Sequence, residues 1–225
     1  MEGSEVKRAQ SLEFARVASY RTHSPHHLRP IRLMLPTRRS RVVVVALAVV
    51  AIACGDPTKP NATFTNVLTR YALFAFTGAP VNAATAISFL GGPARADASF
   101  AFDVAFDLDG AGRPIVYPVR SIASDLAGTV KRVGLQVVSG PFDSVREVPA
   151  TGYDTLAAKS INVGDVLAVE LQDVQNCRFS LGGQSLYAKL TVDSVNASGR
   201  RIYVRTVFDP NCGYRSVVPD SIPKN

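Results

Sequence analysis

The chain has 225 residues, with 25 basic and 18 acidic side chains and a formal net charge of +7, but the charge is unevenly distributed. Residues 1–53 contain nine of the basic side chains, three of the acidic ones and all three histidines. Residues 54–225 therefore carry 16 basic and 15 acidic side chains and no imidazole. Such a balance argues against nucleic-acid binding, which needs a clustered basic surface. Without histidine, this part cannot use Ser-His-Asp or Cys-His catalysis or a histidine-ligated zinc.

An export signal is predicted at residues 34–53. Arg38, Arg39 and Arg41 precede an apolar run over residues 42–53. A membrane-spanning helix needs about 20 apolar residues, whereas a secretory signal has an apolar part of about 7–15 residues behind positive charge. The run therefore predicts a signal peptide, and a buried strand is the alternative because its valines favour strands. Residues 1–33 are predicted to be a gene-model extension before the true start at Met34, or a disordered leader.

The residues at the end of this run, Ala51-Ile52-Ala53-Cys54, resemble the lipobox of bacterial lipoproteins. The resemblance covers residues 34–54 only. It implies that diacylglycerol is attached to Cys54, that the chain is cleaved before this residue, and that the new amino terminus is acylated. Gly55 stands where an Asp would resemble the inner-membrane retention signal of some bacteria. The resemblance therefore implies an exported protein anchored by lipid, with the outer membrane favoured over the inner one, on the periplasmic or surface side.

The rest of the chain divides into a tether and a globular part. Residues 54–63 are rich in proline and small polar residues, which predicts a tether between the membrane and the fold. Residues 64–225 are enough for one β-rich domain. Two small β modules with a break near residues 155–162 are the alternative.

Strand patterns dominate this globular part. Alternating or continuous apolar runs, bounded by Gly, Pro, Asn and Asp, predict strands at residues 68–76, 84–90, 100–108, 115–119, 133–138, 166–171, 186–195 and 201–208, and a short one at 145–148. The run at 68–76 predicts a strand buried on both faces, with a short helix as the alternative, and the alternation at 100–108 predicts a half-buried strand. One helix is predicted at residues 121–133. The fold class predicted is all-β, an antiparallel sandwich or small barrel with at most one short helix.

Two cysteines remain besides Cys54. Cys177 and Cys212 lie before and after the last predicted hairpin, and thiols of an exported chain tend to pair in an oxidising compartment. A structural disulfide between them is the prediction, and two separate thiols are the alternative.

Few residues suggest chemistry. Asp107 and Asp109 precede Gly110 as at the start of a calcium loop, but two carboxylates are too few for calcium and a hairpin turn explains the same residues. Arg201, Tyr203 and Arg205 would share one strand face, which could bind an anionic polymer or a partner's edge, or be an ordinary solvated face.

These patterns lead to a functional hypothesis with alternatives. We expect a lipid-anchored envelope protein that acts as a non-catalytic binding or structural module, with no cofactor and with a protein or polysaccharide of the envelope as partner. The alternatives are a hydrolase that uses carboxylates without histidine and a carrier of a small apolar ligand.

Overall fold

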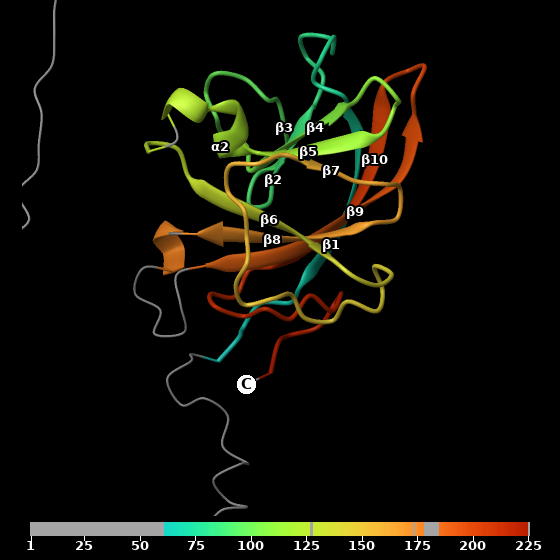
Figure 1. Ribbon diagram of the computed structural model, residues 1–225. Helices are drawn as coiled ribbons and strands as arrows, with labels where there is room; N and C mark the ends of the chain where they lie inside the picture. The colour runs from blue at the N-terminus through green and yellow to red at the C-terminus, as the bar shows by residue number, and fades with distance from the viewer. Residues whose placement is uncertain (1–60, 127, 173, 178–184, 225) are drawn as a thin grey trace, which may run out of the picture. The chain divides into compact units, whose positions relative to one another are not determined.

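The computed structural model describes residues 61–126, 128–172, 174–177 and 185–224. The predicted signal peptide, Cys54 and residues 54–60 of the tether lie outside this range. The described residues belong to one compact unit built from two antiparallel sheets (Figure 1). No helix among them is both long and apolar enough to cross a membrane.

The first sheet, sheet A, has five strands in the order β1-β10-β9-β8-β6. Its strands are β1 (Val67–Phe74), β6 (Arg132–Val138), β8 (Val166–Gln172), β9 (Leu186–Asn196) and β10 (Arg201–Asp209). Strands β9 and β10 form the hairpin that the sequence predicts, with one register shift between Tyr203 and Val204. Strands β1 and β6 are its two edges.

The second sheet, sheet B, has the order β3-β2-β4-β5-β7 and shorter strands. They are β2 (Ala86–Ser88), β3 (Gly92–Ala94), β4 (Val104–Leu108), β5 (Pro114–Pro118) and β7 (Lys159–Ser160). Strand β5 follows β4 as its hairpin partner, as predicted. On its other side it meets only the two residues of β7, so its prolines remove few ladder hydrogen bonds.

The core lies between the sheets. Sheet B contributes Ile87, Phe106 and Val116, and sheet A contributes Leu135 and Leu190, all to one buried cluster. Because apolar side chains from both sheets meet in this cluster, the described residues form a sandwich rather than a closed barrel. The predicted all-β antiparallel class is confirmed.

A second apolar cluster covers the outer face of sheet A. The loop after β6 places Phe142, Val145 and Val148 on Ala168 and Val207 of the sheet. Sheet A is therefore buried on both faces at its centre, and even Lys189 is only 1% exposed.

Two predictions of burial were wrong. Strand β1 is not buried on both faces: it is an edge strand, and Leu73 is its one fully buried residue. Conversely, all five residues of β4 are buried. Its acidic side tolerates burial because Asp107 pairs with Arg200 at 2.7 Å and, just before the strand, Asp103 pairs with Lys131 at 2.6 Å.

The predicted helix at residues 121–133 was also wrong. The structure has a single turn of α-helix, α2 (Val119–Ile122), then the 3₁₀ turn η1 (Ser124–Leu126). Gly128 and the β-branched Thr129 and Val130 follow, and such residues disfavour helix. The Arg120 guanidinium donates to the Val130 carbonyl at 3.0 Å, which closes the connection so that the chain can enter β6.

A strap formed by residues 149–155 crosses the outer edge of β6. Leu135 and Asp154 exchange two backbone hydrogen bonds of 2.9 and 3.1 Å. The strap approaches so closely that a Cβ atom on Gly134 would lie 2.6 Å from the Cβ of Tyr153. The Tyr153 hydroxyl donates to the Pro149 carbonyl at 2.8 Å, and burial raises the pKa of this tyrosine. Glycine at position 134 is therefore a steric requirement of the strap.

Candidate functional site: a groove beside β6

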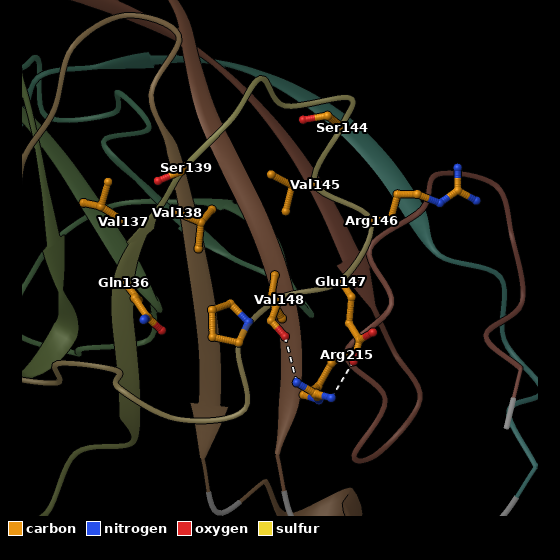
Figure 2. Close-up of a pocket in the computed structure, with 11 residues that line it drawn as sticks. Gln136, Val137, Val138, Ser139, Ser144, Val145, Arg146, Glu147, Val148 and Arg215 are labelled. Carbon is orange, nitrogen blue, oxygen red and sulfur yellow. Dashed lines mark hydrogen bonds and ion pairs between the residues drawn. The ribbon is translucent and has the colours of Figure 1, made fainter. Parts of the chain in front are cut away.

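An open groove of about 740 Å³ lies between the end of β6 and the loop that follows it. Figure 2 shows residues of β6 on one side, residues of the loop across from them, and Arg215 at one end. The valines at 137, 138, 145 and 148 supply its apolar surface, and its polar residues are Gln136, Ser139, Ser144, Arg146, Glu147 and Arg215.

An ion pair and backbone hydrogen bonds hold one wall of the groove in place. Arg215 pairs with Glu147 at 2.5 Å and donates to the Val148 carbonyl at 3.1 Å (Figure 2). The Val148 N–H donates to the Arg215 carbonyl at 3.0 Å, and the Val217 N–H donates to the Arg146 carbonyl at 2.8 Å. The loop is therefore joined to the C-terminal segment much as two strands are joined.

Lys189 anchors the same loop from beneath. Its ammonium group donates to the carbonyls of Phe142 and Val145, both at 2.7 Å, and lies 4.3 Å from the centre of the Phe142 ring. The Arg205 guanidinium lies 4.4 Å from the centre of the same ring. The pKa of Lys189 is lowered to about 8, chiefly by burial; Asp143 raises it, and Arg205 and Arg146 lower it.

The two glutamates of residues 54–225 are both engaged. Glu147 forms the ion pair described above. Glu170, in β8, accepts hydrogen bonds from Gln172 at 2.7 Å, Ser185 at 3.0 Å and the Tyr187 hydroxyl at 3.2 Å. Burial, and then the charge of Glu170, raises the pKa of Tyr187. Each carboxylate thus has partners that organise the fold.

Of the two weak candidates for calcium, Asp109 stabilises the turn between β4 and β5, whereas Asp107 contacts residues outside that hairpin. Asp107 pairs with Arg200 and also accepts from the Thr77 hydroxyl. Asp109 accepts from the backbone N–H groups of Ala111 and Arg113 at 2.9 and 2.8 Å, and these bonds, with that of the Arg113 side chain, lower its pKa. No cluster of three or more potential metal ligands occurs among the described residues.

Arg201, Tyr203 and Arg205 lie on the outer face of β10, near the β1 edge. Arg205 is neutralised by Asp193 at 3.1 Å and Asp143 at 3.6 Å. The Arg201 guanidinium lies 4.7 Å from the centre of the Phe74 ring, and Tyr203 is 38% exposed. The three residues therefore share a face, but Arg205 belongs to an internal charge network.

A second, smaller cavity of about 250 Å³ opens at one end of the sandwich. Leu90, Val133, Leu171 and Val174 give it a largely apolar lining, and the ion pair of Lys131 with Asp103 stands at its edge. It is close to η2 (Gln175–Cys177), whose last residue forms the disulfide with Cys212.

Comparison with known proteins gives no relative for this chain: no family model, curated protein or solved structure matches it. The groove itself was missed in the sequence. Residues 145–148 were predicted as a strand, but they form only one bridge, between Glu147 and Ser216. The sequence of residues 145–148, two valines with an arginine and a glutamate between them, was the available signal. It does not reveal that this segment contacts residues 215–217.

Proposed function

We propose that this chain is a lipid-anchored, non-catalytic binding module of the cell envelope, and that the groove beside β6 binds a segment of a partner protein. The observation that carries the proposal is the groove's construction. Polar and charged side chains supply most of its accessible surface and valines the rest, and interfaces of non-obligate complexes are as a whole about as polar as the rest of a protein surface. Its wall is fixed in advance by the backbone hydrogen bonds that join the loop to residues 215–217, which lowers the entropy cost of binding.

The state of the carboxylates favours a binding module over a hydrolase. Glycoside hydrolysis requires one carboxyl group as an acid and a second as base or nucleophile on opposite sides of a substrate. Glu170 is buried and engaged by three hydrogen-bond donors, and Glu147 forms an exposed ion pair with Arg215. Asp103 and Asp107 are buried and paired with cations.

The lipid anchor and the location are part of the same proposal. They are supported by the resemblance of residues 51–54 to a lipobox and by the proline-rich composition of residues 54–63. The folded part begins soon afterwards, with β1 at Val67. The groove would therefore be held near the membrane surface, with the outer membrane favoured.

A second candidate function is favoured by the smaller cavity. Its apolar lining and volume of about 250 Å³ suit a short alkyl chain or a single aromatic ring. This volume is below the range of about 300–1,000 Å³ that is usual for ligand pockets, so the carrier function ranks behind the binding module.

The anchor is tested by metabolic labelling with a palmitate analogue. We expect label on the wild-type chain and none on the Cys54→Ser variant, because the thioether requires the thiol of this residue. The variant should also leave the membrane fraction, since each buried methylene of the acyl chains contributes about 0.8 kcal/mol to anchoring. Equal labelling of the two chains would refute the lipoprotein assignment.

The groove is tested by site-specific photocrosslinking in intact cells. A benzophenone amino acid at Ser139 or at Ser144 should give an adduct with the same partner protein, because both residues line the groove. The matched control carries the probe at Arg113, in the turn between β4 and β5 of the other sheet. An identical adduct from position 113, or none from either groove position, would contradict the proposal.

A further inference from the structure

We propose that strand β1 is a docking edge for an extended acidic segment of a partner protein, which would add to sheet A as a sixth strand beside residues 68–72. The inference concerns the edge opposite to β6 and does not depend on the groove. Three features of β1 support it. Within the residues that the structure describes, its central backbone groups are unpaired and Arg70 lacks an ion-pair partner, and the small Ala72 leaves the ring of Tyr203 exposed.

The backbone of β1 is unpaired along its middle. In an antiparallel ladder the N–H and C=O groups of successive residues point alternately to the two sides. On the side away from β10, the Asn66 backbone bonds to residues 220 and 221, and the Phe74 N–H donates to the Ala84 carbonyl. The backbone N–H and C=O groups of the even-numbered residues of β1 therefore point away from β10. Leu68, Arg70 and Ala72 have no partner for these outward groups among the described residues.

The free stretch is long enough for a strand. Five residues of antiparallel strand span about 17 Å, and the outward residues each offer one donor and one acceptor. Both ends are closed, by the C-terminal segment at Asn66 and by the chain near Ala84 at Phe74. An added strand is therefore limited to a defined register between these two contacts.

Charge favours an acidic residue in the centre of that strand. Arg70 is exposed and makes no ion pair within the described part of the chain. Its direct neighbour across the sheet is Arg205, which Asp193 and Asp143 already neutralise. On the side away from β10, Arg70 has no neighbouring strand among the residues that the structure describes. An acidic residue placed there by an added strand would stabilise the pair, because opposite charges directly across two strands attract.

The side chains flanking Arg70 leave room for apolar contacts. Ala72 lies opposite Tyr203, so the small methyl group leaves the tyrosine ring accessible from the edge. On the other side, Leu68 lies opposite Val207 and is only partly buried. An extended segment with apolar residues on either side of its acidic one would cover both.

The same features disfavour a second copy of this chain as the occupant. Two β1 strands paired antiparallel through all their outward residues would place Leu68 opposite Ala72 and Arg70 opposite Arg70. Like charges in direct opposition destabilise a strand pair, and charged residues on edges commonly prevent such self-association. A shifted register would avoid this contact only by giving up hydrogen bonds.

The test uses two heptapeptides, Thr-Val-Thr-Glu-Thr-Val-Thr and the same peptide with Lys in place of the central Glu. With ¹⁵N-labelled protein and up to about 1 mM peptide, a concentration that detects binding of about −4 kcal/mol, we expect the Glu peptide to shift the amide signals of Leu68, Arg70 and Ala72. The Glu peptide should bind about fivefold more tightly than the Lys peptide.

Three variants make the test specific. Arg70→Glu should reverse the preference between the peptides, and Arg113→Glu, the same charge change on the other sheet, should preserve it. Ala72→Pro should abolish binding, because it removes an outward N–H group that the ladder to β10 does not use, as is tolerated in edge strands. Absence of binding, a preference unchanged in Arg70→Glu, or unimpaired binding in a folded Ala72→Pro variant would each overturn the proposal.

Discussion

Removing the disulfide with the Cys177→Ala, Cys212→Ala double substitution should lower the free energy of unfolding by about 4 kcal/mol. The bridge joins residues 35 apart in sequence, and in the chain-entropy model a closed loop of this size restricts the unfolded chain by about that amount. The loop contains the whole β9–β10 hairpin, the centre of sheet A. Urea denaturation of the two proteins measures the difference.

The reduced wild type is the internal control for this prediction. Dithiothreitol should bring its stability close to that of the double variant, whose own stability should not respond to the reductant. A loss below about 1 kcal/mol would mean that the bridge adds little to the fold. Two free thiols at Cys177 and Cys212 in a non-reducing mass measurement would show that the bridge is absent from the protein as made.

Lys189 should contribute a rise in the stability of the wild type between about pH 8 and pH 10.5, and Lys189→Met should lack this contribution. The pKa of Lys189 is lowered to about 8 from its usual 10.5, chiefly by burial. Between these values the unfolded chain binds a proton at this site and the folded chain does not, so the free energy of unfolding increases with pH. The slope is at most about 1.4 kcal/mol per pH unit.

Hydrogen exchange measures how much the same substitution loosens the loop that Lys189 holds. Lys189 donates to two carbonyls of the groove loop, and an unpaired buried carbonyl costs about 1–3 kcal/mol. In Lys189→Met we therefore expect the Ser144 and Val148 amides to exchange at least about tenfold faster at pH 7. Lys224→Met, at an exposed lysine, is the matched control for both measurements. A pH profile shared by the wild type and Lys189→Met would contradict the prediction.

The strands were predictable from sequence where their own side chains determine the pattern. Strands β8, β9 and β10 are continuous or alternating runs bounded by turn residues, and their bounds agree closely with those predicted. The disulfide was predicted because two thiols remain in a chain that we expect to reach an oxidising compartment, and the structure joins Cys177 to Cys212. The helix was not predictable because Ile122, Leu126 and Val130 have helical spacing, whereas β-branched residues and the pairing of β6 with β8 decide the outcome.

Burial and the groove depend on contacts between distant residues. Lys189 alternates with apolar residues as an exposed lysine would, and only the loop at residues 142–145 reveals it as buried. The charges of Asp103 and Asp107 are balanced by Lys131 and Arg200. The wall of the groove needs residue 147 to meet residue 215, and a single sequence contains no local signal for that pairing.

The way in which the chain enters the fold determines how it would withstand a mechanical load. The amide groups of Thr63 and Phe64 both donate to Asn211 Oδ1 at 2.9 Å, and Asn211 Nδ2 donates back to the Phe64 carbonyl at 2.8 Å. The next residue, Cys212, is covalently joined to Cys177. If the chain is anchored at Cys54 as proposed, tension on it would load these hydrogen bonds to Asn211 before it reached the ladder between β1 and β10, and the crosslink at Cys212 would keep residue 211 in place while the bonds hold.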